Sequence, residues 1–116
     1  MSEKIVCEYL NLFFSSEIDF DAIRKLLLDS FTFSGPLLKA NSADEYITLL
    51  KSIGSGNLSM NLDKILSDSE QVAVLYDMIT PHGTVRTVEW FTVKDNKIGS
   101  IELLNDPRLF AEAFSK

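Results

Sequence analysis

The feature of this sequence that most constrains its fold is a change of hydrophobic period near residue 57. From there on, apolar and polar residues alternate, first over 57–63 and then over about 71–79, 84–94 and 97–105. A period of two places successive side chains on opposite faces of a β-strand. The second half of the chain is therefore predicted to form an antiparallel meander of strands.

Two short links between these strands have the composition of hairpin turns. They span 80–83, with Pro and His at the centre, and 94–97, where Asn96 tolerates the left-handed conformation. If the first hairpin turns on its central residues, Asp77 lies opposite Arg86, which is an attractive cross-strand pair. This register predicts a mostly apolar inner face made of Val74, Tyr76, Met78, Val85, Thr87, Glu89 and Phe91.

The first half of the chain shows helical spacing instead. Residues 2–15 carry apolar side chains three and four positions apart, which indicates a helix covered by other elements. Asp19 is placed to cap a second helix whose apolar face runs over 23–30. The alternation in 31–33 predicts a short strand after it.

Two further helices complete the predicted order. The third begins with the capping box at 42–45 and ends at Gly54, and a short terminal helix begins at Asp106-Pro107 with apolar side chains within 110–114. Helices segregated from a curved antiparallel sheet are typical of the α+β class. We expect one such domain over residues 1–116.

Composition narrows the classes of partner. The net charge is −6 and no basic stripe is present, so nucleic acid and anionic membranes are not expected partners. No apolar stretch approaches ~18 residues, so no membrane span is predicted and the cytoplasm is the simplest compartment. Cys7 is interpreted as a buried, inert thiol; a catalytic thiol would need His82, the single histidine, as its base.

Glu89 is the sharpest candidate for chemistry. In an apolar pocket its neutral form would be favoured and its pKa raised. A protonated carboxyl group can donate a hydrogen bond to a ligand carbonyl or act as general acid or base. The alternative is a carboxylate satisfied by Tyr76 or by a helix group. Tyr76 and Thr87 either orient a ligand through their hydroxyls or belong to the core.

The register of the last hairpin depends on Glu102. A plain two-residue turn sets Glu102 opposite Glu89, and like charges in that position destabilise a sheet. A bulge at Gly99 removes the conflict and turns the alternate residues of the last strand inward, so the bulge is the favoured interpretation. The predicted ligand-contacting residues are Tyr9, Asn11, Thr87, Phe91, Ile101, Leu103 and Asn105.

The outer face of the first hairpin, which turns at 80–83, is also too apolar to remain in water. An exposed apolar patch of this kind usually marks a protein partner, and a self-complementary dimer is the commonest case. We therefore expect a homodimer. Its predicted interface residues are Leu75, Ile79, Val88 and Trp90.

Five short sequence segments, taken in their order along the chain, resemble those of a known protein superfamily. Two of them, DFDAI at 19–23 and DSFTFSGP at 29–36, resemble the second helix and first strand of the nuclear transport factor 2-like superfamily, in particular its SnoaL-like branch. The other three, EWFTV at 89–93, NKI at 96–98 and NDP at 105–107, resemble its last hairpin and exit. The resemblance implies a cone-like (cystatin-like) sheet wrapped by helices, a small-molecule pocket and often a dimer.

The resemblance also bears on function, because the superfamily includes ketosteroid isomerases, polyketide cyclases and epoxide hydrolases. Its isomerases hold a basic aspartate where this chain has Gly35, and an acid where Glu89 falls. Their helix-one tyrosine corresponds most nearly to Asn11, with Tyr9 two residues earlier. No metal or cofactor motif is present. We expect a small hydrophobic-ligand pocket, either of an isomerase, cyclase or lyase using Glu89 and Tyr76, or of a non-catalytic ligand-binding or dimerisation domain.

Overall fold

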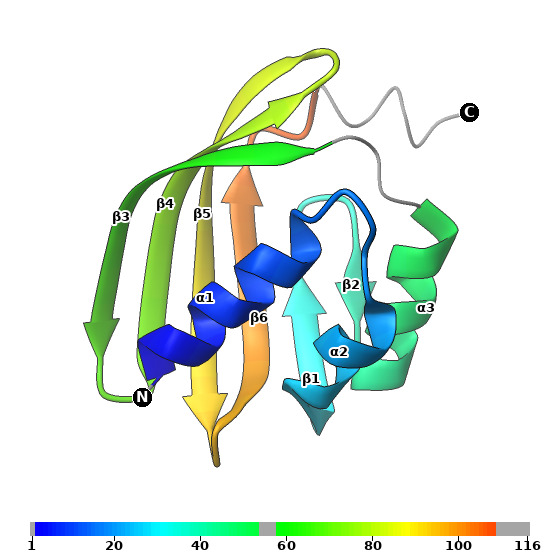
Figure 1. Cartoon of the computed structure of the whole chain (residues 1–116), viewed down its shortest axis with the longest axis vertical. Helices are drawn as coiled ribbons and strands as arrows, with labels where there is room; N and C mark the ends of the chain where they lie inside the picture. Colours follow the sequence, from blue (N-terminus) through cyan, green and yellow to red (C-terminus); the bar gives the residue numbers. More distant parts are fainter. Residues whose placement is uncertain (1, 54–57, 109–116) are drawn as a thin grey trace.

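The structure, a computed structural model, describes residues 2–53 and 58–108 and shows an α+β fold with one six-stranded sheet (Figure 1). The strand order is β2-β1-β6-β5-β4-β3, and all neighbouring strands are antiparallel except β1 and β6. The elements are α1 (Ser2–Phe13), α2 (Phe20–Lys25), β1 (Leu27–Ser34), β2 (Lys39–Ala40), α3 (Ala43–Ile53), β3 (Ser59–Asp68), β4 (Gln71–Thr80), β5 (Gly83–Lys94) and β6 (Lys97–Asn105).

The helices lie on the concave side of the curved sheet (Figure 1). Helix α1 runs across β3 to β6, while α2 and α3 pack on β1. This arrangement encloses an aromatic and aliphatic core between helices and sheet, which is the usual way that such elements bury their apolar faces. None of the helices in the described residues is long and apolar enough to cross a membrane. The fully buried side chains of the core include Val6, Tyr9, Ile23, Leu27, Phe31, Val72, Val74, Tyr76, Phe91, Ile98 and Ile101.

The predicted helix caps are present. Asp19 accepts the amide proton of Ala22 at 3.0 Å, and the Ser42 hydroxyl accepts that of Glu45 at 3.1 Å. The Glu45 carboxylate reaches back one residue further than expected, to the amide of Asn41 at 3.1 Å. The predicted cap at Gly54 and most of the predicted terminal helix lie outside the described residues.

The second helix is shorter than its apolar pattern predicts. It ends at Lys25, and β1 begins at Leu27 instead of at residue 31. The physical reason is pairing with β6: the Leu26 carbonyl accepts the amide proton of Ile98 at 2.7 Å, and Leu27 aligns with Ile98. Apolar side chains after Lys25 reach the core from a strand and not from a helix. The helical spacing of these residues therefore placed the end of the second helix too late.

The predicted register of the first long hairpin is confirmed. Thr80 pairs with Gly83, and Asp77 faces Arg86, whose guanidinium donates to the Asp77 carboxylate at 3.1 Å. Arg86 also binds Asp63, which lies at an irregularity of the edge strand β3. Alternate side chains of β4 and β5 therefore lie on one buried and one more exposed face, as the predicted turn implies.

The last hairpin contains the predicted bulge. Thr92 pairs with Ser100 and Val93 with Ile98, which leaves Gly99 as the extra residue. The turn itself holds Asn96 at a φ of 60°, in the left-handed region that asparagine tolerates. Beyond the bulge Glu89 faces Leu103, while Glu102 faces Trp90 and is exposed. The two glutamates therefore lie on opposite faces of the sheet.

Candidate functional site

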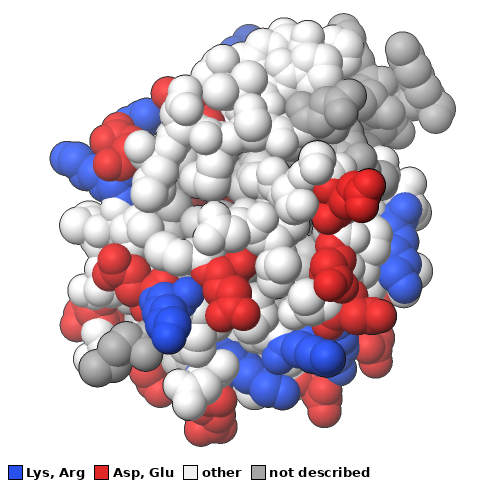
Figure 2. Space-filling model, in the orientation of Figure 1, with Lys and Arg blue, Asp and Glu red and all other residues white. Residues whose placement is uncertain are grey.

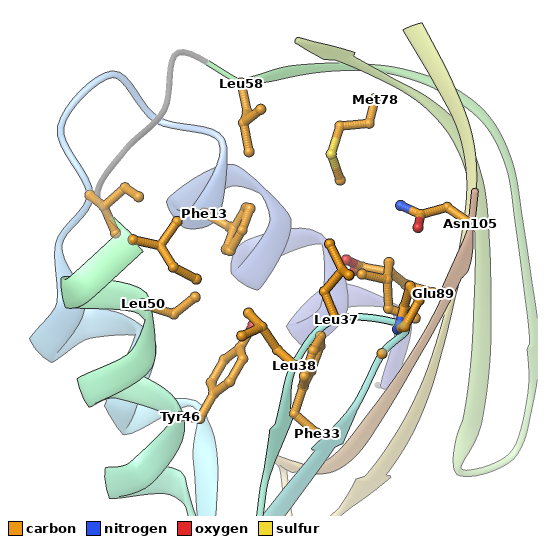
Figure 3. Close-up of a pocket in the computed structure, with 15 residues that line it drawn as sticks. Phe13, Phe33, Leu37, Leu38, Tyr46, Leu50, Leu58, Met78, Glu89 and Asn105 are labelled. Carbon is orange, nitrogen blue, oxygen red and sulfur yellow. The ribbon is translucent and has the colours of Figure 1, made fainter. Parts of the chain in front are cut away.

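A cavity of about 130 Å³ lies between the helices and the concave side of the sheet. Its walls come from the end of α1, the loop between β1 and β2, α3 and strands β4 to β6. Figure 3 shows Tyr46 and Leu50 projecting from α3 on one side, with Glu89 and Asn105 on the opposite, sheet side. The lining residues are Phe13, Ile18, Phe33, Gly35, Pro36, Leu37, Leu38, Tyr46, Leu50, Ile53, Leu58, Met78, Glu89, Leu103 and Asn105.

Only three polar side chains, all among the described residues, reach this apolar cavity: Tyr46, Glu89 and Asn105. The hairpin register turns Glu89 inward from β5, and the bulge turns Asn105 inward from β6. An apolar concavity with a few placed polar groups has the composition of a small-molecule site. On the face seen in Figure 2, charged side chains gather mainly at the lower part and the rims, and the upper centre is largely uncharged.

Glu89 is a buried carboxyl group with one free oxygen. Its side chain belongs to a residue only 5% exposed, and its Oε1 accepts a hydrogen bond from the Tyr76 hydroxyl at 3.1 Å. Its Oε2 is buried and has no partner. Burial raises the pKa of Glu89 from 4.5 to about 7, although the Tyr76 hydrogen bond acts in the opposite direction. The group is therefore placed to be both an acid and a base near neutral pH.

Two further tyrosines meet beside the cavity. The hydroxyl oxygens of Tyr9 and Tyr46 lie 2.5 Å apart, joining α1 to α3. Burial raises the pKa of Tyr9 well above its usual range, and the nearby Tyr46 and Glu89 add to the effect. Burial also raises the pKa of Tyr46, against the Tyr9 hydrogen bond. Both phenols therefore stay protonated at neutral pH, and Tyr46 presents its hydroxyl at the cavity wall.

Asn105 is held by a short chain of hydrogen bonds. The Thr87 hydroxyl donates to the Val85 carbonyl at 3.1 Å, and the Asn105 Nδ2 donates to the Thr87 hydroxyl at 3.5 Å. The Asn105 Oδ1 is buried without a partner. Two buried acceptor oxygens, from Glu89 and Asn105, are thus unsatisfied at one cavity. Buried polar atoms without partners are rare, so each calls for an explanation such as a ligand or water.

The predicted ligand-contacting residues separate into three groups. Leu103 and Asn105 line the cavity, as does the predicted acid Glu89. Asn11 is exposed on α1 and does not line the cavity, because the helix turns Tyr9 toward the sheet and Asn11 toward solvent. The remaining predicted contacts, Tyr9, Thr87, Phe91 and Ile101, are buried in the core behind the wall, as is the predicted catalytic residue Tyr76.

Tyr46 lines the cavity, whereas the predicted catalytic Tyr76 does not. Tyr76 does not line the cavity, because its hydroxyl is committed to Glu89, so it is placed to position the carboxyl group. Tyr46 was not singled out by the sequence analysis, yet it supplies the hydroxyl at the wall. A signal was present: Tyr46 is the polar-tipped member of the apolar face of α3, and a buried hydroxyl needs a partner.

Gly35 lines the cavity at the position where the resemblance places the base of the isomerases. A Cβ atom there would lie 3.2 Å from the Phe33 ring and 3.5 Å from the Leu103 Cβ, so a larger side chain would be crowded. No second carboxylate takes its place among the described lining residues. The described residues also contain no cluster of three His, Cys, Asp or Glu able to hold a metal ion.

The predicted interface residues lie on the convex side of the sheet. Trp90 is 45% exposed, and its indole donates to the Gln71 side chain at 2.5 Å. Leu104 (55% exposed), across from Val88, and Leu66 (68% exposed), across from Ala73, extend the apolar surface. Leu75, Ile79 and Val88 are half-buried between them.

Comparison with known proteins gives the fold. No protein-family model matches the chain, and no curated protein matches it in sequence. An NTF2-like protein of unknown function from Cytophaga hutchinsonii is similar in structure, with a TM-score of 0.81, 20% identity, and coverage of 96% of this chain and 95% of that chain. A protein provisionally assigned as a SnoaL-like polyketide cyclase, from Shewanella putrefaciens, gives a TM-score of 0.82, 9% identity, and coverage of 98% and 85%.

A third similar structure was provisionally assigned as a ketosteroid isomerase and comes from Kribbella flavida. Its TM-score is 0.79 at 12% identity, with coverage of 90% of this chain and 77% of that chain. At such identities a likeness is evidence of a common architecture and not of a common reaction. The chain therefore has the nuclear transport factor 2-like fold, with SnoaL-like proteins among its structural neighbours.

Proposed function

We propose that the cavity binds a small, largely apolar carbonyl compound and that Glu89 moves a proton on it, as an isomerase, cyclase or lyase would require. The observation that carries this proposal is the buried, unpartnered Oε2 of Glu89 at the wall of an apolar cavity. Leaving such an oxygen without a hydrogen bond costs stability. Strongly perturbed carboxyl groups in a cavity are typical of sites that use them.

The size of the cavity limits the ligand. An engineered cavity of roughly 150 Å³ in another protein accepts benzene. The cavity of about 130 Å³ is therefore suited to a compound near the size of one six-membered ring. The provisional assignments of two structural neighbours, as a polyketide cyclase and a ketosteroid isomerase, also belong to carbonyl chemistry and support this class.

The mechanism begins with Glu89 in its ionised form, which is well populated near neutral pH because its pKa is about 7. The Glu89 Oε2 accepts the proton from the carbon next to the ligand carbonyl, the electron pair of that C–H bond forms a C=C bond, and the π pair of the carbonyl group moves to its oxygen. In this mechanism Tyr9 is the donor in the hydrogen bond between the two hydroxyls, which leaves the proton of Tyr46 available to that oxygen. Glu89 then returns the proton to another carbon, while Tyr76 holds the carboxyl group in place.

Proton exchange in heavy water tests this proposal without knowledge of the natural substrate. We expect the protein to accelerate deuterium incorporation at the carbon next to the carbonyl of ring-sized ketones. The exchange can be monitored by proton NMR. Glu89→Gln keeps the size of the side chain but cannot take the proton, so exchange should fall by at least about 100-fold. Glu102→Gln, on the exposed opposite face, is the matched control. Exchange that Glu89→Gln leaves unchanged would remove the catalytic proposal.

The second candidate is a non-catalytic pocket for a small ligand. It is favoured by Gly35, which leaves Glu89 as the only carboxyl group among the described lining residues. The same experiment separates the two functions. Ring-sized ketones that shift the NMR signals of cavity residues but exchange no protons would select binding over catalysis.

We also propose that the convex face pairs with a second copy of the chain. Support comes from the exposed side chains of Leu66 on β3, Trp90 on β5 and Leu104 on β6, with the half-buried Ala73 of β4 between Leu66 and Trp90. A two-fold pairing buries the same patch on both copies. Sedimentation at micromolar concentration should give a dimer, Trp90→Lys should give a monomer, and His82→Ala at the exposed turn should change nothing. A monomeric unmodified protein would contradict this proposal.

A further inference from the structure

The two unsatisfied atoms at the cavity are both oxygens: that of Asn105 can only accept a hydrogen bond, and that of Glu89 accepts one when the carboxyl group is ionised. They are the Oε2 of Glu89 and the Oδ1 of Asn105. Tyr46 supplies a donor, but from the opposite wall on α3 (Figure 3). The sheet side of the cavity is therefore short of donors, and an occupant that brings none leaves at least one buried acceptor unpaired.

The orientation of the Asn105 amide follows from its neighbours. The Thr87 hydroxyl has one proton, and it donates that proton to the Val85 carbonyl at 3.1 Å. It can therefore only accept from Asn105, which must present its NH₂ group to Thr87 and its oxygen to the cavity. The acceptor character of this wall thus depends on a core threonine that does not itself line the cavity.

The register also sets the spacing of the two oxygens. Glu89 pairs with Leu103, and Thr87 pairs with Asn105, so Glu89 and Asn105 are diagonal neighbours on one face of the β5–β6 ladder. Diagonal neighbours have Cα atoms about 7–8 Å apart, with side-chain atoms nearer. Leu103, which is across from Glu89 and two residues before Asn105 on β6, has an apolar side chain that lines the same wall. A ring lying over Leu103 can thus reach both polar groups from substituents close together on the ring.

We propose that the ligand carries an O–H or N–H donor beside its carbonyl group, as hydroxyketones and lactams do, and that Asn105 Oδ1 accepts from this donor. The inference rests on the proposed binding function and narrows its ligand class. A site whose buried acceptor is paired only by the right ligand discriminates strongly against analogues that lack the donor. Asn105 is then a specificity residue, and Thr87 is a positioning residue that acts through it.

The test uses ring-sized probes that differ in the donor. δ-Valerolactam has a carbonyl and an N–H group, N-methyl-δ-valerolactam has the carbonyl with the nitrogen blocked, and cyclohexanone has a carbonyl alone. Their dissociation constants can be measured by NMR titration of ¹⁵N-labelled protein, following the amides of Gly35 and Leu103. Asn105→Leu keeps the side-chain size and removes the acceptor, and Thr84→Ala, at an exposed position of β5 outside the cavity, is the control.

We expect Asn105→Leu to raise the dissociation constant of δ-valerolactam by at least about ten-fold. The dissociation constants of cyclohexanone and the blocked lactam should change by less than about two-fold. Thr87→Val removes the hydroxyl that orients the Asn105 amide, so it should also weaken the binding of δ-valerolactam alone. This second variant tests the donor requirement independently of any effect of Asn105→Leu on folding. Thr84→Ala should change none of the three constants.

The possible failures are distinguishable. If the probes bind but Asn105→Leu and Thr87→Val change all three affinities equally, or none, the donor requirement is wrong while the binding function stands. If no probe shifts the amides of the cavity residues at millimolar concentration, the binding function fails, and the donor requirement fails with it.

Discussion

Glu89→Gln should abolish a pH dependence of folding stability that amounts to roughly 3 kcal/mol. The pKa of Glu89 rises from 4.5 to about 7 on folding, so between these pH values the folded state binds a proton that the unfolded state has released. The contribution of Glu89 protonation to the free energy of unfolding is therefore fully present below about pH 4.5. It declines as the pH rises and is lost above about pH 7. The hydroxyls of Tyr9, Tyr46 and Tyr76, which surround this carboxyl group, have raised pKa values and stay neutral throughout.

Urea denaturation of both proteins between pH 4 and 9 measures this effect. The other carboxyl groups contribute equally to both proteins, so they cancel in the difference between the two unfolding free energies. Any fixed cost of the glutamine amide shifts that difference by a constant and leaves its slope unchanged. Glu102→Gln is the control, because that side chain is exposed. A difference that stays constant across this pH range would mean that Glu89 titrates in water and not in an apolar cavity.

Phe91→Ala should destabilise the fold by roughly 3–5 kcal/mol. Phe91 is completely buried on β5 and meets the Tyr9 ring edge-on, with ring centres 5.7 Å apart. The substitution removes that contact and leaves a void between α1 and the sheet. Since a domain of this size is stable by about 5–15 kcal/mol, much of its margin would be lost.

Denaturant titration again supplies the measurement, with Thr84→Ala as control. Thr84 lies on the same strand with its side chain exposed, so its replacement should stay within about 0.5 kcal/mol. Phe91→Leu, which keeps most of the buried volume, should fall between the two. A loss below about 1 kcal/mol for Phe91→Ala would show that α1 does not pack on β5 as described.

The parts of the site that could be predicted from sequence are those that depend on neighbouring strands. The inward direction of Glu89 follows from one turn and one cross-strand charge pair, and the bulge at Gly99 follows from the conflict between Glu89 and Glu102. Both inferences use the fixed period of a strand, so a correct turn determines every later side chain. The pairings of β4 with β5 and of β5 with β6 confirm them.

The parts that could not be predicted depend on how the helices dock. Helical spacing showed that α1 and α3 each have an apolar face, but not how each helix is rotated on the sheet. Asn11 was therefore expected in the cavity and is exposed, while Tyr46 was overlooked and lines it. Tyr76 is a separate case that involves no helix: its hydroxyl donates to Glu89 within the β4–β5 pair, which is the alternative that the sequence left open for this carboxyl group.

The single extra residue at Gly99 has a consequence for how such proteins can diverge. If Gly99 were paired in a regular ladder instead of bulging, the strand end would slip by one residue, and Glu102 and Leu104 would take the positions held by Leu103 and Asn105. A change that removes the bulge but keeps the residue would thus bring a second carboxyl group to the cavity in place of the amide, without any substitution among the lining residues. Descendants of one ancestor could in this way acquire unrelated chemistries on an almost unaltered scaffold.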